Sequence, residues 1–113
     1  MRSTRRVVTI QSGEEAGRYS DPSLLVLASL ANGPKHGHAM IEDIAQMSGT
    51  KLGPGTLYGA IARLETQGWI EALPAEDRRQ PYQITAKGLR VLRAQLNTLN
   101  QFAKAGLRRL ASL

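Results

Sequence analysis

The sequence predicts a mainly α-helical protein with a small β-hairpin: a winged helix-turn-helix followed by a long C-terminal dimerisation helix. Three observations predict this fold. Residues 22–67 hold three short segments with helical apolar spacing, separated by turns rich in glycine and proline. Residues 69–85 hold two short apolar runs around a polar loop. Residues 86–113 repeat apolar side chains at alternating three- and four-residue steps.

The length of 113 residues favours one compact domain with an added helix. We expect residues 1–20 to be a flexible basic N-terminal arm, residues 21–85 a winged helix-turn-helix domain, and residues 86–113 a dimerisation helix. No apolar run reaches the roughly 18 residues of a membrane span, so no membrane association and a cytoplasmic location are expected. The absence of cysteine excludes disulfides, thiolate catalysis and cysteine-ligated metals.

The charge is unevenly distributed along the chain. Fifteen Lys and Arg against nine Asp and Glu give a net charge of +6, which favours a polyanionic partner such as nucleic acid. However, residues 21–85 hold five basic and seven acidic side chains, whereas residues 86–113 hold six basic and no acidic ones. DNA binding by the middle of the chain must therefore depend on how its charges are arranged.

Each of the three short helices has a recognisable start. Asp21 and Pro22 begin a helix that we expect to reach Asn32, with Asp21 as its N-cap. A second helix is expected over residues 37–47. The third is expected to begin at residues 53–54 and to run to Gln67, before Gly68 ends it. The second and third helices, joined by small residues, have the plan of a helix-turn-helix, and the third should bury Leu57, Ile61 and Leu64.

The remaining chain predicts a wing and a long helix. The pattern predicts two strands, over residues 69–73 and 81–85, around a loop with a basic tip at Arg78 and Arg79. Thr85 can then cap a helix that extends to the C-terminus. The seam of this helix has no second partner in so short a chain, which predicts a homodimer. The expected dimerisation residues are Leu89, Leu92, Leu96, Leu99, Ala103 and Leu110.

Four local strings, taken with this order of elements, resemble the PadR family of winged-helix transcriptional regulators over residues 22–110. They are LANGPKHG at residues 30–37, GTLY at 55–58, RLETQGWI at 63–70 and YQITAKG at 82–88. His38, Gly59 and Trp69 depart from the residues that the family commonly has at these places. The resemblance implies a dimeric repressor whose third helix enters the major groove and whose wing touches the flanking backbone. It also implies that a small-molecule effector could release the DNA.

The third helix has the side chains that a groove-binding helix needs. Small residues near its N-terminus let the backbone approach the base edges, while hydroxyls and an arginine can bond bases or phosphates. Two-fold symmetry of the protein would match a near-palindromic operator in double-stranded DNA. The expected DNA-binding residues are Lys51, Gly55, Thr56, Tyr58, Gly59 and Arg63 from the helix-turn-helix, and Arg78, Arg79 and Gln80 from the wing.

Other functions fit the sequence less well. No converging nucleophile, base or carboxylate pair indicates an enzyme, and His36 and His38 alone do not indicate a metal site, so no cofactor is expected. Trp69 is expected to fill the core rather than to bind an effector. The arginines of the N-terminal arm and of the last helix are open to both a DNA-binding and a solvated interpretation. The competing hypothesis is a winged-helix dimer that serves as a protein interaction module, which the acidic middle of the chain favours.

Overall fold

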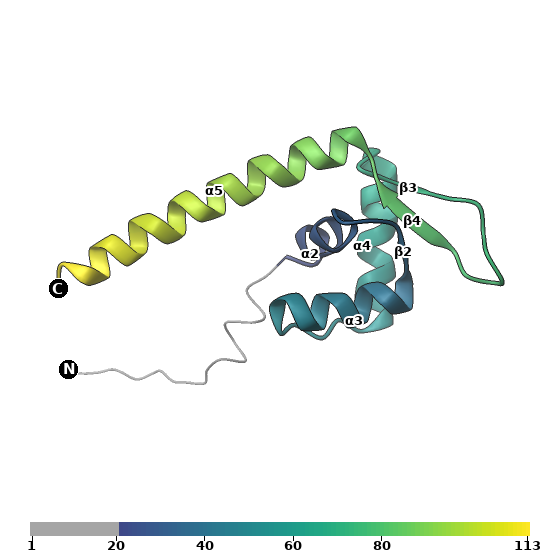
Figure 1. Cartoon of the computed structure of the whole chain (residues 1–113), viewed down its shortest axis with the longest axis horizontal. Coiled ribbons are helices and arrows are strands. Elements are labelled where there is room, and N and C mark those ends of the chain that lie inside the picture. Colours follow the sequence, from purple (N-terminus) through teal and green to yellow (C-terminus); the bar gives the residue numbers. More distant parts are fainter. Residues whose placement is uncertain (1–20) are drawn as a thin grey trace.

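The computed structural model describes residues 21–113. The predicted basic arm, residues 1–20, lies outside the described residues. Three short helices form a bundle beside a small sheet, and one long helix leaves the bundle (Figure 1). In chain order the elements are α2 (Pro22–Leu30), β2 (Lys35–His36), α3 (Gly37–Ser48), α4 (Pro54–Gln67), β3 (Ile70–Ala72), β4 (Pro81–Ile84) and α5 (Ala86–Ala111).

The helices start where the sequence predicts, because the capping residues form the expected bonds, although α2 ends at Leu30, two residues before the expected Asn32. Oδ1 of Asp21 accepts a hydrogen bond from the backbone N–H of Ser23, 3.1 Å away, at the start of α2. Gly68 ends α4 with a φ of 76°, in the left-handed region that favours glycine. Thr85 caps α5 by accepting from the N–H of Gly88 at 3.0 Å, and its hydroxyl donates to the carbonyl of Gly68 at 2.7 Å.

The sheet has three strands instead of the two predicted for the hairpin. The antiparallel order is β2-β4-β3, so the two-residue strand β2 pairs with the outer edge of the wing. In the register of this pairing, Lys35 lies opposite Tyr82 and His36 opposite Pro81. A two-residue strand has no periodicity to recognise, which is why the sequence did not predict it. This pairing ties the start of α3 to the wing.

The hydrophobic core lies between α2, α3, α4 and the inner face of the sheet. Leu57, Ile61 and Leu64 are buried on α4, as predicted. Trp69 is half-buried and packs against the core from the base of the wing, which agrees with a structural role. The other large side chains of the core include Leu27 and Leu30 from α2, Met40 and Ile44 from α3, Ile70 from β3 and Leu92 from α5.

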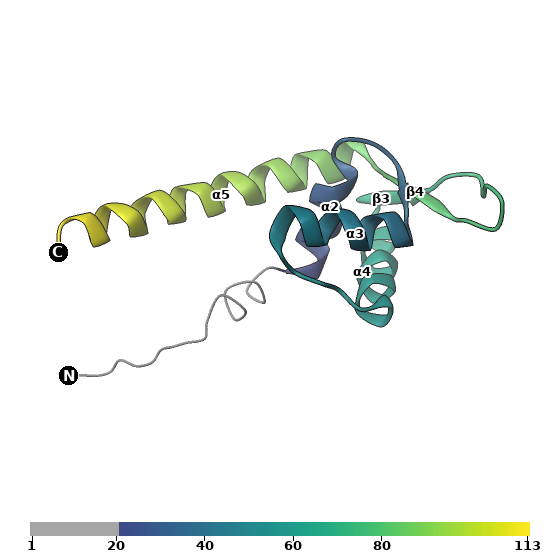
Figure 2. The same ribbon diagram turned by 60° about the horizontal axis from the view of Figure 1, so that its bottom comes forward.

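Helix α5 packs its first turns against α2 and β4 and then extends away from the bundle (Figures 1 and 2). At 1.5 Å per residue its 26 residues span about 39 Å. In both views the C-terminal part of the helix runs away from the other described elements. Within residues 21–113, no helix combines the length and the apolar character needed to cross a membrane.

Candidate nucleic-acid interface

Helix α4 presents a smooth outward face between two larger side chains. With about 100° of rotation per residue, Gly55, Gly59 and Ala62 fall on the side opposite the buried stripe. Tyr58 and Arg63 flank this side, about 140° apart around the helix axis. Small residues in the middle allow the helix backbone to come close to a flat surface or a groove floor, while the flanking side chains reach the groove walls.

Tyr58 occupies the flank nearer the wing. Its side chain is 50% exposed, and its hydroxyl rests against the backbone of Gly37 at the start of α3. A Cβ on Gly37 would overlap this hydroxyl. The absence of a side chain at Gly37 therefore fixes the position of the Tyr58 ring, a role for Gly37 that the sequence analysis did not predict.

The predicted basic tip of the wing is a tight turn. Glu76 and Arg79 exchange two backbone hydrogen bonds of 2.9 and 2.7 Å. The two residues between them, Asp77 and Arg78, have φ values of 45° and 71°, the signature of a type I′ turn. Arg78 is an unusual residue for this conformation, which costs a non-glycine side chain about 1 kcal/mol or more. The turn holds an arginine at the outermost point of the wing at the expense of some backbone strain.

The wing and α4 meet at one pocket. Its volume is about 320 Å³, and Tyr58 from α4 lines it together with Arg78, Arg79 and Gln80 from the wing. His36 and Gly37 line it from the start of α3. Gln80 has an internal role, because its amide nitrogen donates to the carbonyls of Leu73 at 2.6 Å and Pro81 at 3.0 Å. Four of the nine predicted DNA-binding residues are thus brought together by the fold.

The other predicted DNA-binding residues lie away from this pocket. Lys51 and Thr56 are exposed, before and within the first turn of α4. The guanidinium of Arg63 turns toward the start of α2, where Nη2 lies 3.5 Å from the hydroxyl of Ser23. Arg63 therefore stands on the flank opposite the wing, and the structure does not bring it together with Tyr58.

Several acidic side chains of residues 21–85 have partners inside the fold. Asp21 caps α2. Asp43 accepts from the hydroxyl of Ser29 at 2.7 Å and lies 3.9 Å from the ammonium of Lys35. Glu71 accepts from the amide of Gln83 at 2.6 Å. These three carboxylates lie outside α4 and the wing tip, and Asp43 is offset by the charge of Lys35.

The two histidines bond to residues in the first turns of α3. Nδ1 of His36 accepts from the N–H of Ala39 at 3.5 Å, and Nε2 of His38 lies 3.4 Å from the carboxylate of Glu42. Within residues 21–113, no group of three or more His, Cys, Asp or Glu side chains is placed to hold a metal ion.

The predicted dimer seam divides into a buried and an exposed part. Leu92 is 5% exposed and belongs to the core of its own chain. By contrast, Leu96 and Leu99 are 44% and 41% exposed, and Leu89 and Leu110 are exposed further along the same side of α5. Ala103 lies between them and is exposed as well. The structure adds Phe102 and Leu107, which are 68% and 66% exposed and which the three-and-four spacing did not include.

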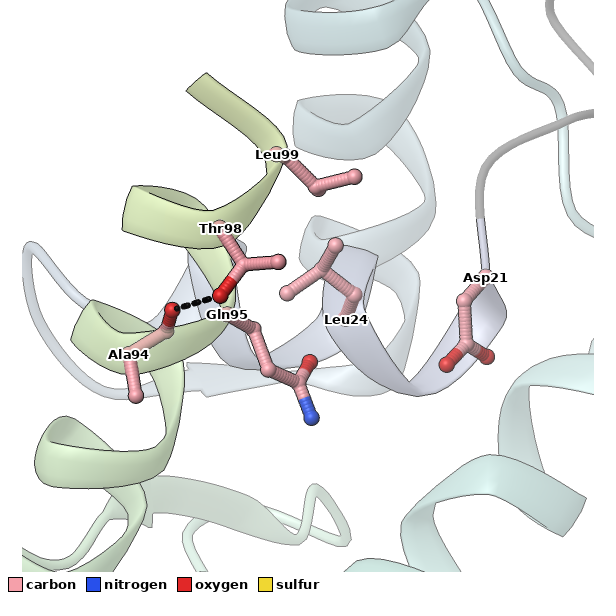
Figure 3. Close-up of a pocket in the computed structure, with 6 residues that line it drawn as sticks. All are labelled: Asp21, Leu24, Ala94, Gln95, Thr98 and Leu99. Carbon is pink, nitrogen blue, oxygen red and sulfur yellow. Dashed lines mark hydrogen bonds between the residues drawn. The ribbon is translucent and has the colours of Figure 1, made fainter. Parts of the chain in front are cut away.

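A groove runs between α2 and the exposed part of this seam (Figure 3). Leu24 of α2 and Leu99 of α5 point into it, and Thr98 turns its hydroxyl back to the carbonyl of Ala94 at 3.1 Å. Asp21, Ala94 and Gln95 complete the lining. The groove has a volume of about 430 Å³, and it continues the apolar side of α5 onto α2.

The comparisons with known proteins agree with this fold. The family model described as "Transcriptional regulator PadR-like family" matches residues 26–94. A PadR family transcriptional regulator from Eggerthella lenta is 30% identical, with a TM-score of 0.68 over 85% of each chain. A transcriptional regulator from Clostridium thermocellum is 26% identical, with a TM-score of 0.67 over 74% of this chain and 86% of its own.

One curated relative is a 37.1 kDa protein in transposon TN4556 of Streptomyces fradiae. It is 42% identical over 82 residues, which is 73% of this chain. The matched region spans 24% of the relative, so this chain corresponds to about a quarter of that protein.

Proposed function

Because this chain belongs to the transcriptional regulator PadR-like family, we propose that it binds double-stranded DNA as a homodimer, with α4 in the major groove and the wing on the flanking backbone. Membership of a family of transcriptional regulators agrees with the expectation that the chain is not an enzyme. The observation that carries the proposal is the shared pocket, since it joins Tyr58 of α4 to Arg78 and Arg79 of the wing.

The proposed docking assigns a different role to each part of the surface. Gly55 and Gly59 let α4 approach the base edges, and Thr56 offers a hydroxyl near its N-terminus. Tyr58 and Arg63, on opposite flanks, reach the two walls of the groove. Lys51, Arg78 and Arg79 contact phosphates, which position a protein without reading sequence. Gln80 supports the wing through its bonds to Leu73 and Pro81.

The proposed dimer uses the exposed side of α5. Leu89, Leu96, Leu99 and Leu110 would be covered by the same helix of a second copy, and the groove against Leu24 would receive part of that helix. Two α4 helices related by two-fold symmetry would then read a near-palindromic operator. Repression, and release by a small-molecule effector, are part of the proposal by resemblance to the family.

The test is a titration of labelled duplexes selected from random DNA, at several salt concentrations. DNA binding should weaken steeply with salt because bound counterions are released, whereas an apolar protein interface should not. Arg63→Ala should weaken binding by about 1–3 kcal/mol. If Arg63 contacts phosphate from its flank, the loss should be similar for all sequences; if it reads a base, sequence preference should relax at one position. A parent protein that binds no duplex at low salt would replace this proposal with the protein interaction module.

A further inference from the structure

His36, at the start of α3, and Arg79, in the wing loop, face each other across the pocket. Nη1 of Arg79 lies 3.3 Å from Nε2 of His36. The other ring nitrogen of His36, Nδ1, accepts from the backbone N–H of Ala39. A neutral imidazole has one protonated nitrogen, so an acceptor at Nδ1 places the proton on Nε2. A guanidinium can only donate. In this tautomer Nε2–H and the guanidinium are two donors directed at one point, whereas in the other tautomer Nε2 accepts from Arg79.

The surroundings of this pair suit an anion. His36 and Arg79 line the pocket that Tyr58 and Arg78 share, and none of the described residues that line it is acidic. Of the neighbouring side chains, Gln80 directs its amide nitrogen to two backbone carbonyls, and His38 pairs with Glu42. An anionic oxygen placed between Nε2 and Nη1 would accept from both donors and remove their conflict, forming charge-assisted hydrogen bonds.

We propose that a phosphodiester oxygen of the DNA backbone completes this pair, accepting from Nε2–H of His36 and from Nη1 of Arg79. The inference rests on the proposed function and adds a residue to it, because His36 was assigned only to the turn. His36 is also the point where β2 pairs with β4 and α3 begins. One phosphate held here fixes the wing relative to the helix-turn-helix, so the contact sets the depth at which Tyr58 and α4 enter the groove.

Two substitutions separate the functions of the two ring nitrogens. His36→Asn keeps an acceptor near the Nδ1 position for the N–H of Ala39, and asparagine is a favoured N-cap, but it lacks the Nε2 donor. His36→Gln places an amide donor near the Nε2 position. A hydrogen bond to a charged group has a net value that corresponds to about tenfold or more in affinity. We therefore expect His36→Asn to weaken DNA binding about tenfold and His36→Gln to restore most of it.

The control is Gln46→Asn, a polar substitution at an exposed side chain later in α3 that does not line this pocket. It should leave DNA affinity unchanged. Arg79→Gln should reduce the dependence of log affinity on log salt by about 0.9, the value for one phosphate contact. Combining it with His36→Asn should cost less than the two separate losses together, because both donors serve one oxygen.

A scan with methylphosphonates, which remove the charge of one phosphate at a time, locates the contact on a selected duplex. The parent protein should lose affinity at one phosphate per half-site, and His36→Asn should lose less at that same phosphate, because only Arg79 still contacts it. If His36→Asn binds like the parent, or keeps the full loss at every position, the inference is overturned while the proposed function stands. If inorganic phosphate alone shifts the His36 ring resonances and DNA affinity is unchanged by His36→Asn, the pair binds free anions and the assignment to DNA is also overturned. Failure of the parent to bind any duplex overturns the proposed function itself.

Discussion

The hydroxyl of Tyr58, on α4, lies against the backbone of Gly37 at the start of α3. The start of α3 therefore limits the positions that the Tyr58 ring can adopt. The two residues are 21 positions apart in the sequence, and glycine is needed at one of them because of an aromatic ring at the other. The contact links the packing of the helix-turn-helix to the surface that we propose for DNA binding. It also allows a clean test by pairing two substitutions.

Gly37→Ala should displace the Tyr58 ring and destabilise the protein by about 1–3 kcal/mol, the usual cost of overpacking. Removing only the hydroxyl would leave the ring carbon Cζ 2.8 Å from the added Cβ, so the whole ring must be removed to relieve the overlap. We therefore expect Tyr58→Ala to recover much of the loss when it is combined with Gly37→Ala. Urea unfolding of the four proteins in this cycle measures the coupling. Additive effects in the cycle would contradict the contact.

Arg78 should respond to substitution in opposite ways in stability and in binding. Arg78→Gly gives the Asp-Gly pair that type I′ turns prefer, so stability should be maintained or rise by up to about 1 kcal/mol. The same change removes the phosphate contact that we propose for Arg78, so affinity for all duplexes should fall and the salt dependence should decrease by about 0.9. Arg78→Lys, with the charge retained in the same strained turn, is the control. Equal DNA affinity for Arg78→Gly and the parent would exclude the wing tip from the interface.

Leu92 and Leu99 should differ in what they stabilise, although both fit one heptad seam. Leu92→Ala opens a cavity in the core of the single chain and should cost about 2–5 kcal/mol of folding free energy. Leu99→Asp changes a side chain that is 41% exposed in the single chain, so the helix should form but the dimer should dissociate. Circular dichroism and sedimentation equilibrium separate the two outcomes. A Leu99→Asp protein that remains a dimer at micromolar concentration would contradict the proposed interface.

The phenol of Tyr82 should make the protein sensitive to strong alkali. Burial raises the pKa of Tyr82 above the ordinary tyrosine value, and the nearby Glu65 carboxylate and Tyr58 raise it further. In the unfolded chain this phenol ionises near pH 10, whereas in the folded chain it stays neutral to higher pH. The unfolded state therefore binds fewer protons, and stability must fall as pH rises above about 10. Tyr82→Phe should reduce that fall in urea titrations between pH 9 and 11, and an unchanged slope would contradict the assignment.

The sequence by itself determined the order and limits of most elements, because the signals for them are local. Asp21 and Thr85 cap the helices that follow them, and Gly68 ends α4, through bonds between residues that are close in the chain. The buried side of α4 was equally predictable from the sequence, since helical spacing decides which side chains share a face. The same local patterns carried the family resemblance.

Only the tertiary structure decided which of these residues meet. Strand β2 is too short to have a pattern, yet its pairing with β4 brings His36 to Arg79 across 43 positions of sequence. The bundle buries Leu92 and leaves Leu99 exposed, but the heptad spacing could not distinguish them. Periodicity shows which side chains share one side of a helix, and it does not show which other element covers that side. In the same way, the overall charge of residues 21–85 concealed the fact that Asp43 is bonded to Ser29 and lies beside Lys35 in the fold. Contacts between distant residues depend on how the elements pack, and packing is a property of the whole chain.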